Sequence, residues 1–321
     1  MPKLKVIFDT DPGIDDAMAL LLLARHPRVE LAAITTVFGN GAIGTVTRNA
    51  LYLAARFGIS APVARGADRP LVGEAGPPPT FVHGHNGLGD IQLPPVQGNL
   101  DPRPAHRLIA EMVRSDPGGV TVIAVGRMTN LALALAEAPD IAGKVARVVV
   151  MGGAFGHGGH TGNVTPVAEA NIWGDPHAAD IVFGADWPIT IVPLDVSQET
   201  QMSERYLADL AEVAGEDGRF VRSVSAFYQE FHRQSAGIDG FYVHDSSAVA
   251  YALHPEFFRT ETGTVRVVTD GIAAGQTLIK PDAKRFPPSA WDNRPSQTIC
   301  TEVNAAAVLD LYRRTLLGHG T

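Results

Sequence analysis

The sequence predicts an α/β fold, an open, doubly wound, mainly parallel sheet of the Rossmann-like type, with extra helices near the C-terminus. Three observations favour this class. Short runs rich in β-branched residues alternate with helical patterns over most of the chain. Runs such as residues 120–125 and 145–151 are apolar throughout, which is typical of parallel strands buried on both faces. Polar clusters follow several runs, where open sheets build their sites.

The expected elements are taken from this alternation of short apolar runs with helical periodicity. Strands are expected at residues 5–8, 31–37, 63–65, 120–125, 145–151, 189–192 and 264–269. Helices are expected at residues 15–25, 45–57, 131–138, 178–183, 203–214, 220–234, 246–253 and 302–316. Residues 73–100 are rich in Gly and Pro and lack periodicity, which is typical of a functional loop. No stretch has the composition of a linker, so we expect residues 1–321 to form a single domain.

The composition restricts the possible partners and compartments. The chain has 321 residues, 45% of them hydrophobic and 19% charged, which is typical of a globular protein. Its formal charge of -8 argues against binding to nucleic acid or to an anionic membrane. The single cysteine, Cys300, excludes an internal disulfide. Since the sequence also shows neither a targeting signal nor an apolar run that could span a bilayer, we expect a cytoplasmic protein.

Four aspartates lie within residues 9–16, from the end of the first expected strand into the first turn of the helix that follows: Asp9, Asp11, Asp15 and Asp16. Carboxylates this close repel one another and stay ionised together only when a positive charge holds them. A hard divalent cation with oxygen ligands meets that need. Helix capping is the alternative for Asp15 or Asp16, but it does not explain acids at the strand end. We therefore interpret this segment as a metal site.

Further polar residues follow other expected strands. Asn40 follows residues 31–37, and Thr129 follows residues 120–125, where it is either a helix N-cap or a ligand through its backbone oxygen. Met151 precedes two glycines that allow a ligand to approach the backbone. His83 lies in the long loop. Taken alone, Asn40 and His83 are more simply a turn residue and a solvated loop residue.

Two later segments add candidate ligands. Asn163, Glu169 and Asn171 suit the binding of vicinal hydroxyls, and Glu169 and Asn171 would point to the same side of an extended backbone. A polar surface loop is the alternative. His244 and Asp245 precede an expected helix, where Asp245 is either an N-cap or a further acid of the metal site. His244 beside it is a candidate proton donor.

Together these segments resemble the nucleoside hydrolase family of the inosine-uridine-preferring type. The run Asp9-Thr10-Asp11-Pro12-Gly13-Ile14-Asp15-Asp16-Ala17 is similar to the signature of that family, and the other motifs follow in the family's order. The resemblance implies a Ca²⁺ ion held by Asp11, Asp16, the main-chain oxygen of Thr129, and Asp245. It implies ribose binding by a second set of residues, Asp15, Asn40, Met151, Asn163, Glu169 and Asn171. It places His83 and His244 beside the base and Asp9 behind the metal.

Two departures from the family pattern are present. Arg127-Met128 stands where the family usually has Pro-Leu, and Ser246 stands where it usually has Pro. Neither change removes an implied ligand, although Arg127 adds a cation beside the metal loop. Tyr228 and His232, four residues apart on one expected helix face, are candidates for contact with the base.

The resulting hypothesis is calcium-dependent hydrolysis of the N-glycosidic bond of a ribonucleoside, purine or pyrimidine, to ribose and free base. Asp11 is the candidate base for the attacking water and His244 the candidate acid for the leaving base. A homodimer or homotetramer is expected by analogy with the family. The alternatives are a catalytically silent nucleoside-binding protein on the same fold and, less favoured, a phosphatase with an aspartate nucleophile, because residues 12–16 do not fit that group.

Overall fold

The computed structural model describes residues 3–95 and 98–319. One large sheet is formed by ten strands: β1 (Leu4–Thr10), β2 (Val29–Thr36), β3 (Val63–Arg65), β4 (Leu100–Asp101), β5 (Val120–Ala124), β6 (Arg147–Met151), β7 (Ile189–Val192), β10 (Phe258–Val267), β11 (Thr277–Pro281) and β12 (Gln297–Val303). Two further strands, β8 (Gln201–Ser203) and β9 (Gly240–Tyr242), form a small antiparallel sheet.

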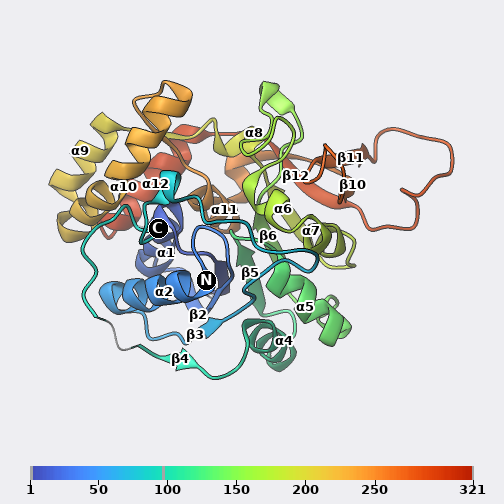
Figure 1. Cartoon of the computed structure of the whole chain (residues 1–321), viewed down its shortest axis with the longest axis horizontal. Helices are drawn as coiled ribbons and strands as arrows, with labels where there is room; N and C mark the ends of the chain where they lie inside the picture. Colours follow the sequence, from blue (N-terminus) through green and yellow to red (C-terminus); the bar gives the residue numbers. More distant parts are fainter. Residues whose placement is uncertain (1–2, 96–97, 320–321) are drawn as a thin grey trace.

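The helices cover both faces of the large sheet. They are α1 (Ile14–Arg25), α2 (Ile43–Phe57), α3 (Thr80–His83), α4 (Ala105–Ser115), α5 (Thr129–Glu137), α6 (Ala170–Gly174), α7 (Pro176–Phe183), α8 (Leu194–Ser197), α9 (Glu204–Val213), α10 (Gly215–Ala236), α11 (Asp245–Leu253) and α12 (Ala305–Leu316). Helices α1, α2, α10, α11 and α12 contribute to one hydrophobic core, whereas α4, α5 and α7 contribute to the other (Figure 1).

The strands of the sheet supply both cores at once. Ile7 of β1 belongs to the core with α4 and α5, and its neighbour Phe8 belongs to the core with α1 and α2. Successive residues of a strand point to opposite faces of the sheet. Both side chains are nevertheless fully buried, because helices cover both faces. This two-sided burial explains why the parallel strands are apolar throughout instead of alternating.

The sheet is doubly wound, as predicted. Its strand order is β11-β10-β12-β7-β6-β5-β1-β2-β3-β4, and neighbours from β12 through β4 pair in parallel. From β1 the chain moves outward through β2, β3 and β4, and from β5 it moves outward in the opposite direction. The winding therefore reverses between β1 and β5, and open α/β sheets bind ligands just outside the carboxyl ends of the strands at such a point.

Several expected boundaries were wrong, mainly near the C-terminus. The closing helix was expected from residue 302, but Glu302 and Val303 belong to β12, and α12 begins after Asn304, whose side chain accepts a hydrogen bond from the Ala307 N–H. The strand expected at residues 264–269 is the longer β10, which pairs antiparallel with β11 and β12. Strands β11 and β12 were not predicted, because their sequences mix polar and apolar residues.

The long loop also differs from the expectation. Residues 73–100 were expected to lack structure, yet they contain the short helix α3, which ends at the buried His83. Residues 96–97 of this loop, and residues 1–2 of the N-terminal segment, lie outside the described part of the chain. No helix within the described ranges is both long and apolar enough to cross a lipid bilayer.

Candidate active site

The first loop of the site joins β1 to α1. Gly13 is the N-cap of α1, and the Asp16 carboxylate accepts hydrogen bonds from the backbone N–H groups of Gly13 (2.9 Å) and Asp11 (3.2 Å). The hydroxyl of Thr10 donates to the same carboxylate. Asp16 therefore does satisfy orphan N–H groups at the start of the helix, as the capping alternative anticipated. Hydrogen bonds from the backbone N–H groups of Asp15 and Asp16 also lower the pKa of Asp15.

Acids from two distant parts of the chain converge beside this loop. Asp15, Asp16 and Asp245 are buried, and each offers a carboxylate oxygen within 4.8 Å of the others. Asp11 is 2% exposed and accepts a hydrogen bond from the Asn40 N–H at 2.8 Å. One oxygen of Asp11 and one of Asp15 are buried without a hydrogen-bond partner. We refer to Asp11, Asp15, Asp16 and Asp245 as the carboxylate cluster.

The carboxylate cluster holds more negative charge than its surroundings neutralise. Burial, followed by repulsion from Asp16, raises the pKa of Asp15 to about 8. Burial and then repulsion from Asp15, Asp16 and Asp11 raise the pKa of Asp245 well above its usual value. The unpartnered oxygens and this mutual repulsion fit a hard, oxygen-preferring dication, because such an ion would accept the free lone pairs and restore the ionised state.

A layer of polar residues supports the cluster from behind. Asp9 is fully buried and accepts hydrogen bonds from the Thr35 hydroxyl and from Asn130 Nδ2 (2.8 Å). Burial raises the pKa of Asp9 to about 7, although these hydrogen bonds lower it. Thr129 is the first residue of α5, whose N-cap is Met128, so the alternative in which Thr129 is the N-cap was wrong. The Thr129 hydroxyl instead donates to Asp175 at 2.7 Å.

The backbone conformation around Glu169 and Asn171 differs from the expected one. Glu169 is the N-cap of α6, and its carboxylate accepts from the N–H groups of Asn171 (2.9 Å), Ile172 (3.1 Å) and Gly153 (3.0 Å). The extended segment that the alternation argument assumed is therefore a helix start, because this acid satisfies the orphan N–H groups. Asn171 Nδ2 donates to the carbonyl oxygens of Val125 (2.8 Å) and Met151 (3.2 Å).

Asn163 lies at the edge of this group. Its side chain is exposed, and its Oδ1 accepts a hydrogen bond from the Ala170 N–H at 3.0 Å, which ties the preceding loop to α6. Asn40 lies closer to the acids, because its Nδ2 donates to Asp16 at 2.9 Å. The structure therefore brings the predicted residues from β1, β2, β5 and β6 to one end of the sheet, with Asn163 as the most exposed of them.

An aromatic wall made of His83, Tyr228 and His232 stands beside the acids. His83 stacks on Tyr228 with ring centroids 5.6 Å apart, and Tyr228 meets the His232 ring edge-on at 4.3 Å. His83 Nδ1 accepts a hydrogen bond from the Ile14 N–H (3.2 Å), so its neutral ring carries the proton on Nε2. His232 Nδ1 lies 2.9 Å from the Tyr228 carbonyl oxygen and must donate to it, which leaves Nε2 as an acceptor.

His244 links this wall to the carboxylate cluster. It is the N-cap of α11, and Asp245 is the first helical residue, so the option of Asp245 as N-cap was wrong. His244 Nδ1 lies 2.8 Å from the hydroxyl of Ser197. Burial, and then the neighbouring His232 and His83, lower the pKa of His244 to about 3. The imidazole is therefore neutral at pH 7, and what it offers a ligand is a neutral ring nitrogen.

Arg127 occupies the position where this chain departs from the family pattern. Its guanidinium lies over the Phe38 ring, 4.3 Å from the centroid. Burial lowers the pKa of Arg127, whereas the charges of Asp11, Asp175 and Glu169 raise it. The same guanidinium lowers the pKa of Asp11, although burial and repulsion from Asp16 dominate and raise it overall. Arg127 is thus a resident cation that offsets part of the charge of the site.

Sequence reasoning did not identify several buried polar residues of this region. Asp175 is fully buried and accepts hydrogen bonds from the Thr129 hydroxyl, from the Leu71 N–H (2.9 Å) and from the Ala178 N–H (3.0 Å). The others are Thr10, Thr35, Asn130 and Ser197. Ser197 was detectable, because it follows the expected strand at residues 189–192 just as Asn40 and Thr129 follow theirs.

Comparison with known proteins agrees with this geometry. Residues 6–310 match the model of the family described as inosine-uridine preferring nucleoside hydrolase. The chain is 39% identical over 315 residues to uridine nucleosidase 1 of Arabidopsis thaliana, covering 98% of this chain and 93% of that protein. It is 39% identical over 285 residues to the inosine-uridine preferring nucleoside hydrolase of Crithidia fasciculata, covering 87% of this chain and 88% of that protein.

Solved structures show the same relationship. The plant nucleoside hydrolase PpNRh1 superposes with a TM-score of 0.94 at 36% identity, covering 98% of this chain and 99% of that one. The purine-preferring ribonucleoside hydrolase from Gardnerella vaginalis superposes with a TM-score of 0.89 at 28% identity, covering 98% and 99% of the two chains. The chain belongs to the inosine-uridine preferring nucleoside hydrolase family and is a hydrolase that acts on the N-glycosyl bond of ribonucleosides.

Proposed function

We propose that this enzyme hydrolyses its ribonucleoside substrates in a calcium-dependent reaction that releases ribose and the free base. The carboxylate cluster is the observation that supports the proposal most strongly. Asp15, Asp16 and Asp245 place oxygens within 4.8 Å of one another, and buried oxygens of Asp11 and Asp15 lack hydrogen-bond partners. Such a group of acids is stable in the ionised state only with a cation among them.

The proposed ligands of the cation are carboxylates of Asp11, Asp16 and Asp245 and the main-chain oxygen of Thr129. All are oxygen donors, as Ca²⁺ prefers. When bound, the ion would supply positive charge that orients water and the sugar hydroxyls. Ca²⁺ is a weak Lewis acid, so activation of the water needs a protein base. We assign that role to Asp11, whose Oδ1 is the free oxygen beside Asp16.

The ribose is assigned to the polar residues on the neighbouring strand ends. Asp15 offers a carboxylate oxygen without a hydrogen-bond partner. Glu169 and Asn171 lie at the N-terminal end of α6, next to Met151. Asn40 and Asn163 complete the proposed ribose-binding set. Negative charge on this side of the sugar favours the oxocarbenium-like transition state of glycosidic cleavage. A deoxyribonucleoside lacks the 2′-hydroxyl group. Its binding would leave buried carboxylates of this set without a hydrogen-bond partner, so the enzyme should discriminate against it.

The leaving base is assigned to the side of His83 and His244. Both imidazoles are neutral at pH 7, because burial lowers the pKa of each to about 3. The N–H group of a neutral ring donates a hydrogen bond to a base nitrogen or oxygen as negative charge develops there. Uridine and inosine are the first substrates to test, because the relatives named above are described as uridine or inosine-uridine enzymes.

A reducing-sugar assay tests the proposal. Uridine, inosine, cytidine, adenosine and guanosine would be incubated with the enzyme as purified, after treatment with EDTA and dialysis, and after addition of Ca²⁺. We expect ribose release from at least one of these nucleosides, loss of that activity with EDTA and its recovery with Ca²⁺. Full activity of the EDTA-treated enzyme would contradict the calcium requirement, and binding of nucleosides without ribose release would support the silent alternative.

A further inference from the structure

Helix α8 forms a part of the site that the roles assigned above do not use. It follows β7 at the same end of the sheet as the carboxylate cluster. Its last residue, Ser197, is fully buried, and the Ser197 Oγ lies 2.8 Å from His244 Nδ1. A serine hydroxyl either donates to or accepts from an imidazole nitrogen, so the distance alone does not say which ring nitrogen of His244 carries the proton.

The surroundings of the hydroxyl decide this question. Among the described residues, the Ser197 hydroxyl has no hydrogen-bond partner other than His244. If His244 carried its proton on Nδ1 and donated it, the hydroxyl proton of Ser197 would be buried without an acceptor. That arrangement is unfavourable, because a buried donor would be left unsatisfied. If Ser197 donates instead, both groups are satisfied, and the proton of the neutral ring is on Nε2.

The backbone of α8 fixes where the hydroxyl lies. The Leu194 N–H donates a hydrogen bond to the Gly153 carbonyl oxygen at 2.9 Å. The N–H group of the same Gly153 donates to the Glu169 carboxylate. The buried Asp195 carboxylate accepts from the N–H groups of Phe155 (2.9 Å) and His157 (2.6 Å). These bonds tie α8 to the loop that follows β6. The position of the Ser197 hydroxyl is therefore set by the same strand ends that set the ribose-binding residues.

We propose that Ser197 is a positioning residue that holds the His244 ring with Nδ1 as acceptor and the Nε2–H group directed to the leaving base. The inference rests on the proposed role of His244 beside the base. Within the described part of the chain, His244 Nε2 makes no hydrogen bond, so it is available to a ligand. A hydrogen bond to the departing base then comes from a ring whose rotation and tautomer are already fixed, which reduces the cost of reaching the transition state.

The direct test is histidine-selective ¹⁵N NMR of the whole enzyme, with the His244 signal identified by its loss in His244→Asn. The chemical shifts of the two ring nitrogens report which one is protonated. We expect the wild-type enzyme to carry the His244 proton on Nε2, and Ser197→Ala to show a mixture of the two tautomers. Protonation of Nδ1 in the wild type would overturn the proposal, whatever the behaviour of the variants.

The kinetic test compares Ser197→Ala, Ser197→Thr and the control Ser225→Ala. Ser225 is equally buried, but its hydroxyl donates within its own helix to the Arg222 carbonyl oxygen. We expect Ser197→Ala to lower kcat for nucleosides about tenfold or more with little change in KM, because the hydrogen bond from Nε2–H to the departing base is weakened. The threonine variant, which keeps a hydroxyl, should recover most of this loss, and the control should match the wild type.

A nitrophenyl riboside separates positioning from a general structural defect. Its leaving group needs no proton, so Ser197→Ala should cleave it at close to the wild-type rate. An equal loss on nucleosides and on the nitrophenyl riboside, or full nucleoside activity of Ser197→Ala, would overturn the positioning role. Failure of the proposed function itself gives a different result. In that case the wild-type enzyme releases no ribose, or His244→Ala loses activity on nucleosides and on the nitrophenyl riboside equally.

Discussion

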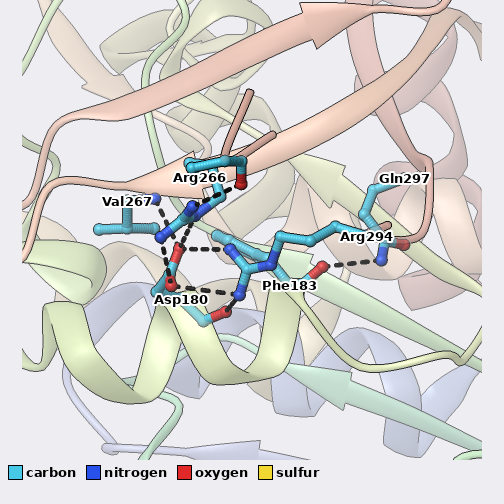
Figure 2. Close-up of polar contacts among 7 residues, drawn as sticks. Asp180, Phe183, Arg266, Val267, Arg294 and Gln297 are labelled. Carbon is cyan, nitrogen blue, oxygen red and sulfur yellow. Dashed lines mark hydrogen bonds and ion pairs between the residues drawn. The ribbon is translucent and has the colours of Figure 1, made fainter. Parts of the chain in front are cut away.

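Asp180, a partly buried carboxylate, and the fully enclosed carboxylate cluster show opposite shifts of pKa. Asp180 of α7 accepts hydrogen bonds from Arg266 Nε (2.9 Å), Arg294 Nη1 (2.9 Å) and the Val267 N–H (3.1 Å) (Figure 2). Burial raises the pKa of Asp180, but the hydrogen bonds from Arg294 and Arg266 outweigh it, and the net shift is downward. In the carboxylate cluster, burial raises the pKa of every acid, and repulsion from neighbouring acids raises it further for Asp11, Asp15 and Asp245.

The difference separates an ion pair that serves the fold from a cluster that serves a ligand. The Asp180 network joins α7 to β10 and to the segment before β12, and Gln297 adds a hydrogen bond to the Phe183 carbonyl oxygen at 2.9 Å (Figure 2). Its charges are balanced within the chain. Among the residues that the structure describes, Arg127 is the one cation acting on Asp11, so the charge balance of the cluster depends on something that binds. Each of the following predictions tests this contrast.

Asp245→Asn should have the largest effect on activity. Loss of one acid of the cluster should lower kcat/KM for ribonucleosides by about 10²- to 10³-fold or more, because a charge that stabilises the transition state is lost. The free energy of unfolding without Ca²⁺ should stay the same or rise, since repulsion among the acids is relieved. Ribose release and chemical denaturation in EDTA measure the two effects. If Asp245→Asn instead lowered the free energy of unfolding as much as the loss of an ion pair does, the acids of the cluster would be stabilising the fold, and the contrast with Asp180 would be wrong.

Asp180→Ala should have the reverse profile. Two arginines would be left without their shared carboxylate, and we expect the free energy of unfolding to fall by about 2–3 kcal/mol. Because the network lies away from the cluster, KM and the response to Ca²⁺ should not change. Asp140→Ala is the matched control, since Asp140 also pairs with two cations, Arg114 and Lys144, but at the exposed surface. The control should change stability little.

Arg127→Met tests the resident cation of the site. Removing a positive charge that lies close to Asp11 and Glu169 should tighten the binding of Ca²⁺ by about tenfold, because repulsion between two cations is lost. Calorimetric titration of the metal-free protein measures the affinity. Arg222→Met is the control, because Arg222 forms an exposed pair with Glu204. Weaker Ca²⁺ binding by Arg127→Met would show that the arginine orients the acids instead of competing with the ion.

The smallest expected effect is a pH dependence of stability assigned to Asp180. Since the folded-state pKa lies below the usual 3.8, Asp180 stabilises the folded protein above that value, and this contribution is lost as the pH falls through the folded-state pKa. The difference in free energy of unfolding between wild type and Asp180→Asn should therefore shrink as the pH is lowered from about 5 to about 3. A difference that grows in this range would contradict the assignment.

Much of the fold was predictable because the parallel strands are buried on both faces. Continuous apolar runs located β1, β2, β5, β6 and β7 to within one or two residues, and polar residues after them pointed to the site edge. Prediction missed β11 and β12 and found only the last part of β10. In β12 (Gln297–Val303), partly exposed polar residues such as Thr298 and Glu302 interrupt the buried ones, so the sequence resembles a loop or a helix. Prediction also failed at Glu169, because a helix cap and an extended segment use the same residue types.

The sequence by itself determined which chemical groups are available: four acids within residues 9–16, a fifth acid, Asp245, beside His244, and amides after the strands. Their spacing along the chain is a local property, so the motif was readable. Only the tertiary structure decided that Asp245 lies next to Asp15 and Asp16, that Asp175 supports Thr129, and that Ser197 faces His244. These contacts join segments far apart in the chain, and the order of strands in the sheet, which no local pattern encodes, brings them together.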